Sequence, residues 1–156
     1  MFSALLHNPA EAGAASVDLS SLVGADASDD GSRVLLVTFF ATWCGPCKRE
    51  LPLLVQLASD YRSRGLRVIS IAIDKNEADW PQIEMLVKDN HVAFPIAKDR
   101  YNLIARRWLG EKTALPSLFL VGRDGLIKLV KQGYTTGAEQ FLRNEIDQAL
   151  IAAAQQ

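Results

Sequence analysis

Cysteine and histidine are scarce in this sequence, which holds two of each among its 156 residues. A small secreted domain held together by disulfides normally uses four or more dispersed cysteines, so a disulfide framework is excluded. A structural zinc site usually needs four ligands. Beside Cys44 and Cys47 only His7 and His91 remain, which disfavours zinc. The two cysteines stand together in the chain, and this indicates chemistry at sulfur rather than structural cross-linking.

An excess of charge and a long apolar run are also missing. Seventeen basic and 18 acidic residues give a formal net charge of −1, and no cluster of Lys and Arg favours a nucleic-acid or anionic-membrane partner. No run approaches the roughly 20 apolar residues that span a bilayer. The N-terminus lacks a positively charged region, and its apolar stretch (2–6) is too short for a signal peptide. Two alternatives stay open: a cytosolic protein, or one whose export segment is absent from this sequence.

The composition favours one globular domain. Apolar residues make up 49% and charged residues 22% of the chain, as in ordinary soluble proteins. The length suits a single hydrophobic core. We expect residues 1–16 to form a flexible segment and residues 17–153 to form one domain.

Three successive segments predict a parallel strand–helix–strand unit of an α/β domain. Residues 33–40 form a continuous β-branched and aromatic run, typical of a strand buried on both faces. Residues 46–63 have helical periodicity, and residues 66–73 form a second buried strand. A helix that joins two parallel strands gives a right-handed crossover. The pattern then predicts a helix over 74–92 capped by Asp79, a strand over 93–97 and a helix over 101–108. A hairpin of strands 117–121 and 126–130 follows. The last helix is expected to begin with a capping box of Thr136 and Glu139 and to bury Phe141.

Cys44 and Cys47 are expected where the first strand meets its helix. Residues three apart on a helix lie about 5–6 Å from each other, within the range of a disulfide. The helix N-terminus carries partial positive charge and unpaired N–H groups, which favour the thiolate form of a cysteine there. Cys44, nearer the helix end and the solvent, is the predicted attacking sulfur, and Cys47 is the predicted resolving sulfur. A haem attachment motif would need His after the second cysteine, where Lys48 stands.

The segment Trp43-Cys-Gly-Pro-Cys47 resembles the active-site motif of the thioredoxin superfamily. The chain resembles the TlpA/ResA-like branch of this superfamily more closely. The features that carry this resemblance are Glu50, the segments 94–99 and 115–125, and Gly133. This resemblance covers residues 17–150. It implies a thioredoxin fold, with a central mixed β-sheet flanked by helices, an N-terminal extension and a βα-type insertion in the middle. It also implies an enzyme that exchanges thiols and disulfides without a cofactor.

The resemblance further implies which residues meet the substrate. Pro116 would be a cis-proline packed against the disulfide, although the sequence alone also allows an ordinary trans-proline that opens a strand. Leu115 would offer backbone groups to an extended peptide. Trp43 and Tyr134 belong either to the contact surface or to the core. The expected contact surface around Cys44 consists of Trp43, Gly45, Pro46, Leu115, Pro116, Gly133 and Tyr134.

Glu50 is the candidate acid–base group. Many thioredoxins carry a buried Asp six residues before the first cysteine, but this chain has Thr38 there. Glu50 lies three residues after Cys47, on the same helix face, and the TlpA/ResA-like proteins use a Glu at this position. Burial would raise its pKa and suit it to accept the Cys47 proton. The alternative is a surface carboxylate beside Lys48 and Arg49.

The expected partners are a cysteine-containing protein substrate and a redox protein that recycles the dithiol. The resemblance implies a monomeric extracytoplasmic protein, with apocytochrome c among the possible substrates, and the Gly45-Pro46 dipeptide of thioredoxin favours a reductant. Two alternatives stay open. A peroxidase of this fold needs Thr where Ala41 stands, and a copper carrier resembles Cys-x₃-Cys with a distant His, for which His91 is available.

Overall fold

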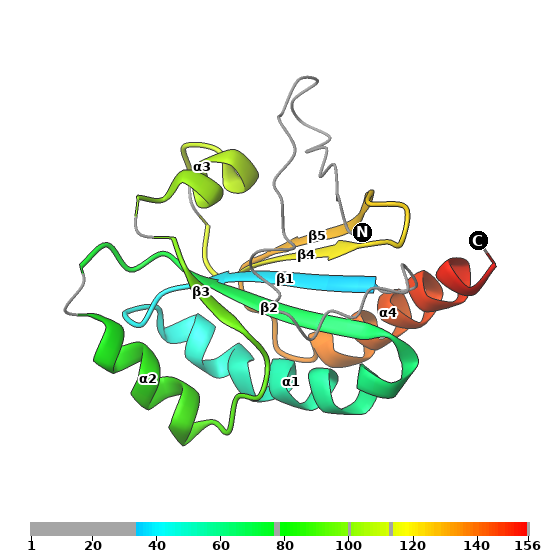
Figure 1. The fold of residues 1–156 in the computed structure, drawn as a ribbon, viewed down its shortest axis with the longest axis horizontal. Coiled ribbons are helices and arrows are strands. Elements are labelled where there is room, and N and C mark those ends of the chain that lie inside the picture. The colour runs from blue at the N-terminus through cyan, green and yellow to red at the C-terminus, as the bar shows by residue number, and fades with distance from the viewer. Residues whose placement is uncertain (1–33, 77–78, 100, 113, 156) are drawn as a thin grey trace.

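The computed structural model describes residues 34–76, 79–99, 101–112 and 114–155. The segment 1–16, predicted to be flexible, lies outside the described residues. The described chain forms a five-stranded sheet with the strand order β3-β2-β1-β4-β5 (Figure 1). The strands are β1 (Val34–Phe40), β2 (Leu66–Ala72), β3 (Ile96–Lys98), β4 (Ser117–Val121) and β5 (Ile127–Gln132), and the α-helices are α1 (Gly45–Tyr61), α2 (Trp80–Asp89), α3 (Leu103–Leu109) and α4 (Ala138–Ala154).

The sheet is mixed, as predicted. Strand β1 pairs parallel with β2, and β2 pairs parallel with β3. Strands β1 and β4 are antiparallel, and so are β4 and β5, which form the predicted hairpin. The parallel β1–α1–β2 unit is therefore confirmed, and it places the end of β1 beside the end of β2.

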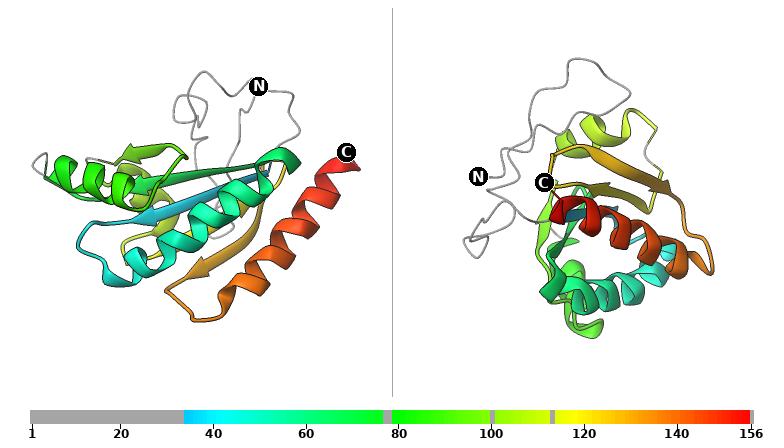
Figure 2. Two further views of the ribbon diagram at one scale, coloured as in Figure 1. Left: turned by 90° about the horizontal axis from the view of Figure 1, so that it is seen from below. Right: turned by 90° about the vertical axis from the view of Figure 1, so that its right-hand side faces the viewer.

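Side chains of β1 alternate between two apolar layers because successive strand residues point to opposite faces. Leu36 packs with Leu57 of α1 and Ile146 of α4 on one face. On the other face Phe39 contacts the ring of Trp108 in α3, with ring centroids 5.8 Å apart. Figure 2 shows the resulting layers, with α1 and α4 covering one side of the sheet and α3 the other.

Several predicted boundaries and caps were wrong. Helix α2 is shorter than predicted. Asp79 occupies its N-cap position as predicted, but the Asp79 carboxylate accepts a hydrogen bond from the Asn76 N–H and makes no capping hydrogen bond to the helix. The predicted capping box is absent: Gly137 precedes α4 with a φ of 81°, and Glu139 pairs with Arg143 one turn further on. Phe141 is 48% exposed rather than buried.

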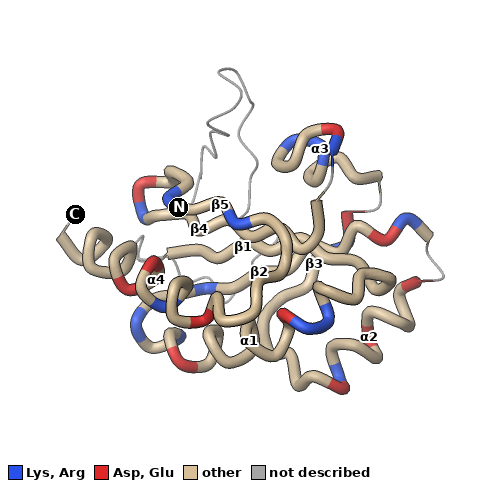
Figure 3. Tube along the Cα trace, turned by 180° about the vertical axis from the view of Figure 1, so that it is seen from behind, with Lys and Arg blue, Asp and Glu red and all other residues tan. Residues whose placement is uncertain are grey.

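Acidic and basic residues are interspersed along the part of the chain that the structure describes (Figure 3). No helix among the described residues is long and apolar enough to cross a membrane.

Candidate active site

The cysteine motif begins α1. Cys44 occupies the N-cap position with an extended backbone (φ −88°, ψ 103°), and its Sγ accepts a hydrogen bond from the Cys47 N–H at 3.2 Å. The first turn contains Pro46, whose missing N–H costs nothing there because the first N–H groups of a helix have no intrahelical partner. The sulfur of Cys44 therefore lies at the positive end of a 17-residue helix.

The two sulfurs form a disulfide, with Cα atoms 5.3 Å apart as the helical spacing predicts. Cys44 is 6% exposed and Cys47 is 5% exposed. These fractions do not separate the two residues, so the expectation that Cys44 is the more accessible sulfur is not borne out by exposure. Their neighbours differ: Trp43, beside Cys44, is 71% exposed, whereas Cys47 lines a small internal cavity.

A buried carboxylate holds the loop that leads into the motif. Asp74 is completely buried and accepts hydrogen bonds from the Thr42 N–H at 3.0 Å and from the Thr42 hydroxyl. The contact arises because β1 and β2 run parallel and end at the same edge of the sheet. Sequence reasoning missed Asp74. The available signal was an acidic residue directly after a buried strand, level with the motif that follows the neighbouring strand.

The loop before β4 lies against the motif. The Leu115–Pro116 peptide bond is cis, as the resemblance implied. Leu115 packs against the apolar cluster that contains both cysteines, and Pro116 lines the same cavity as Cys47. The Gly133 N–H donates to the Pro116 carbonyl at 2.8 Å. The structure thus brings Leu115, Pro116 and Gly133 together beside the disulfide.

The other predicted contact residues lie at the surface. Trp43 and Gly45 are exposed, and Pro46 is half-buried. Tyr134 is 37% exposed, and the guanidinium of Arg49 lies over its ring, 5.4 Å from the centroid. Burial of Trp43 in the core, one of the two alternatives, is therefore wrong.

Glu50 is buried beside Cys47. It is only 2% exposed, so the alternative of a surface carboxylate is wrong. With Cys47, Thr38, Ser70 and Pro116 it lines a cavity of about 10 Å³. Desolvation by burial raises the pKa of Glu50, and the hydrogen bond and positive charge of Lys131 oppose that rise. Thr38, at the position of the usual thioredoxin Asp, is also buried, and its Oγ1 lies 2.6 Å from Ser70 Oγ.

Lys131 was missed by sequence reasoning. Its Nζ donates to Glu50 Oε1 at 3.0 Å and to the Gly133 carbonyl at 2.6 Å, and its side chain is 11% exposed. The predicted strand ended at residue 130, whereas β5 continues to Gln132. The alternation of β5 contained the signal, because Leu129 packs against the apolar cluster on the α1 side of the sheet and Lys131, two residues further on, points to the same face.

A sequence model of the AhpC/TSA family matches residues 10–130. The chain belongs to this family. Among the relatives of this AhpC/TSA chain, the thiol-disulfide oxidoreductase ResA of Oceanobacillus iheyensis is 25% identical over 109 residues, which are 70% of this chain and 54% of ResA. The chain spans about half the length of the curated relatives it matches.

Solved structures agree with this assignment. The thioredoxin-family thiol:disulfide interchange protein of Chlorobium tepidum TLS superposes with a TM-score of 0.66 at 26% identity, over 86% of each chain. StoA of Bacillus subtilis superposes with a TM-score of 0.61 at 24% identity, over 73% of this chain and 82% of StoA. The predicted thioredoxin fold and the resemblance to the ResA-like branch are confirmed.

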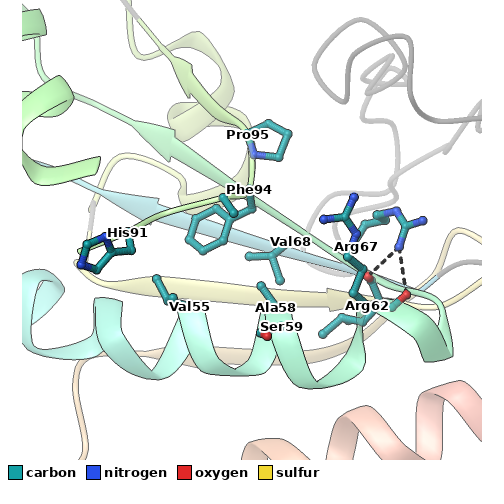
Figure 4. Close-up of a pocket in the computed structure, with 11 residues that line it drawn as sticks. Val55, Ala58, Ser59, Arg62, Arg67, Val68, His91, Phe94 and Pro95 are labelled. Carbon is teal, nitrogen blue, oxygen red and sulfur yellow. Dashed lines mark hydrogen bonds between the residues drawn. The ribbon is translucent and has the colours of Figure 1, made fainter. Parts of the chain in front are cut away.

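A larger groove lies away from the disulfide. It has a volume of about 450 Å³ between α1 and the segment before β3, and its lining includes Arg62, His91 and Phe94 (Figure 4). Neither cysteine lines it. Among the described residues, no three His, Cys, Asp or Glu side chains gather as a metal site; His7 lies outside them.

Proposed function

We propose that the chain is a thiol–disulfide oxidoreductase that transfers two electrons from the Cys44–Cys47 dithiol to a disulfide in a protein substrate. The observation that carries the proposal is the pairing of two sulfurs at the tip of α1 with a buried carboxylate in the cavity of the inner sulfur. The family membership and the relatives named thiol-disulfide oxidoreductase support it.

The reaction follows from the different positions of the two sulfurs. The Cys44 thiolate, stabilised at the end of α1, attacks one sulfur of the substrate disulfide. A mixed disulfide forms, and the first substrate thiolate leaves. Glu50 then accepts the proton of the Cys47 thiol, and the Cys47 thiolate attacks Cys44 Sγ. The enzyme disulfide forms, the second substrate thiolate leaves, and the Glu50 proton neutralises a product thiolate or passes to water.

The proposed substrate surface consists of residues that surround this disulfide. An extended peptide would bind the backbone of Leu115 beside Pro116, and Trp43 and Tyr134 would supply apolar contact on either side. Gly45, Pro46 and Gly133 complete the surface. The two glycines have no side chain and Pro46 has a compact ring, so a peptide backbone can approach closely.

The wider role is also part of the proposal. The protein acts as a monomeric reductant outside the cytoplasm, with apocytochrome c as a candidate substrate, and a second redox protein restores its dithiol. The resemblance to the ResA-like branch supports this assignment. The location is tested by labelling the reduced native protein in intact cells with a membrane-impermeant maleimide. Absence of labelling before lysis and full labelling afterwards would contradict it.

Insulin reduction tests the activity. The wild-type protein with a dithiol donor is expected to precipitate insulin, and Cys44→Ser is expected to be inactive. Cys47→Ser should accumulate a mixed disulfide with the substrate, visible by mass spectrometry, because nothing resolves it. A potential nearer to about −270 mV than to about −120 mV would support a reductant. Peroxide consumption without any disulfide exchange would favour the peroxidase alternative.

A further inference from the structure

Lys131 forms the second half of a buried ion pair with Glu50. Its Nζ lies 3.0 Å from Glu50 Oε1, and the two side chains are 11% and 3% exposed. The ammonium group also donates to the Gly133 carbonyl, and the Gly133 N–H donates to the Pro116 carbonyl. One lysine thus connects the carboxylate beside Cys47 with the loop expected to meet the substrate.

The other groups around Glu50 do not balance its charge. On α1, Cys47 lines the shared cavity, while Lys48 and Arg49 are exposed to solvent. Strands β1 and β2 contribute Thr38 and Ser70, whose hydroxyls pair with each other. Tyr134, which follows Gly133 in the chain, lies under Arg49. Among the described residues, the one positive charge that bonds to Glu50 is therefore Lys131.

A carboxyl group that is buried without a counter-charge keeps its proton, because burial disfavours the charged form. A protonated Glu50 would be unable to accept the Cys47 proton at neutral pH. The burial of Glu50 and its ion pair with Lys131 have opposite effects on this equilibrium.

We propose that Lys131 is a positioning residue that keeps Glu50 ionised and aimed at the Cys47 cavity, so that the resolving step proceeds near neutral pH. This inference rests on the proposed thiol–disulfide exchange. No covalent step is added, since Lys131 donates hydrogen bonds and keeps its proton throughout.

The test compares Lys131→Met, Lys131→Gln and Lys131→Arg with wild type. Lys128→Met is the matched control, since Lys128 lies on the same strand but is exposed and pairs with Asp124. The Glu50 carboxyl is titrated by ¹³C NMR in the oxidised proteins, and insulin reduction is measured across pH 5–9. Lys131→Gln keeps a donor without the charge, and it also replaces Lys131→Met should that variant fail to fold.

Loss of the charge is expected to raise the Glu50 pKa by roughly 1–3 units, the effect of an opposite charge at this distance. The rising limb of the rate profile should move to higher pH with it, and the rate at pH 7 should fall about tenfold or more. Lys131→Arg should lie near wild type, and Lys128→Met should match it.

Three results separate the possibilities. An unchanged Glu50 titration in Lys131→Met and Lys131→Gln would overturn the inference. A shifted titration with an unchanged rate profile would overturn it as well, because the ionisation of Glu50 would then not control the resolving step. Absence of insulin reduction by wild type would reject the proposed function, while the titration would still report whether Lys131 controls Glu50.

Discussion

The two ends of the cysteine motif differ in what surrounds them. Cys44 has an exposed aromatic neighbour and accepts a hydrogen bond from the backbone of its own helix. Cys47 shares a cavity with a carboxylic acid and two hydroxyls, and a lysine lies one hydrogen bond further away. The positive end of a helix is sufficient to stabilise a sulfur that is already a thiolate before it reacts. A sulfur that must lose its proton during the reaction needs a side chain to receive it.

Replacement of Glu50 by Gln would remove the carboxylate that distinguishes the surroundings of Cys47 from those of Cys44. Of the changes considered, it is expected to have the largest effect on the reaction rate. The variant keeps the shape of the side chain but has no proton acceptor, so resolution at pH 7 should slow roughly 10²-fold. Stopped-flow measurement of the mixed-disulfide lifetime across pH 5–9 tests this. Glu139→Gln, which removes an exposed carboxylate of α4, is the control. Equal lifetimes for Glu50→Gln and wild type at every pH would contradict the role.

The same variant should change how stability depends on pH. Because burial raises the pKa of Glu50 above its ordinary value of 4.5, the folded chain binds this proton more tightly than the unfolded chain. The resulting stabilisation is fully present below pH 4.5 and is lost as the pH rises through the folded pKa. Urea titrations of the oxidised protein should show this loss in wild type but not in Glu50→Gln. Parallel stability curves would exclude the raised pKa.

Asp74 acts on the Cys44 end of the motif, because it accepts hydrogen bonds from Thr42 in the loop before Cys44. Asp74→Ala should lower the free energy of unfolding by about 2 kcal/mol, since two Thr42 donors lose a buried acceptor. It should also slow insulin reduction several-fold by releasing the loop before Cys44. Asp99→Ala is a matched control, because Asp99 is a second buried carboxylate that accepts backbone N–H groups, at Leu103 and Ala105. Identical effects of the two variants on the rate would show that Asp74 has no specific influence on the motif.

Trp43 is expected to have the smallest effect. Trp43→Ala removes an exposed apolar surface beside Cys44, so KM for a protein disulfide should rise about fivefold, near 1 kcal/mol. The kcat value should change little, because no reacting atom is affected. Trp80→Ala is the control, since Trp80 lies on α2 and pairs with Glu84. A fall in kcat with an unchanged KM would place Trp43 in the chemical step instead.

The sequence allowed prediction of the features that depend on neighbours along the chain. The β1–α1–β2 unit, the disulfide spacing and the burial of Glu50 follow from periodicity, from the position of Cys44 and Cys47 at a helix start, and from family resemblance. Contacts between distant elements were not predictable in this way. Lys131 lies 81 residues from Glu50, and Asp74 lies 32 residues from Thr42. Strand order and register bring each pair into contact. The sequence did not predict either contact.

The paired hydroxyls of Thr38 and Ser70 give the cavity a property that a second carboxylate would lack. Either oxygen serves as the donor, because each hydroxyl hydrogen rotates about its C–O bond. The pair is therefore a neutral dipole whose direction reverses without displacement of a carbon or oxygen atom. During the proposed proton transfer from Cys47 to Glu50, this dipole can reorient by rotation about a single bond, without any change in the packing of the core.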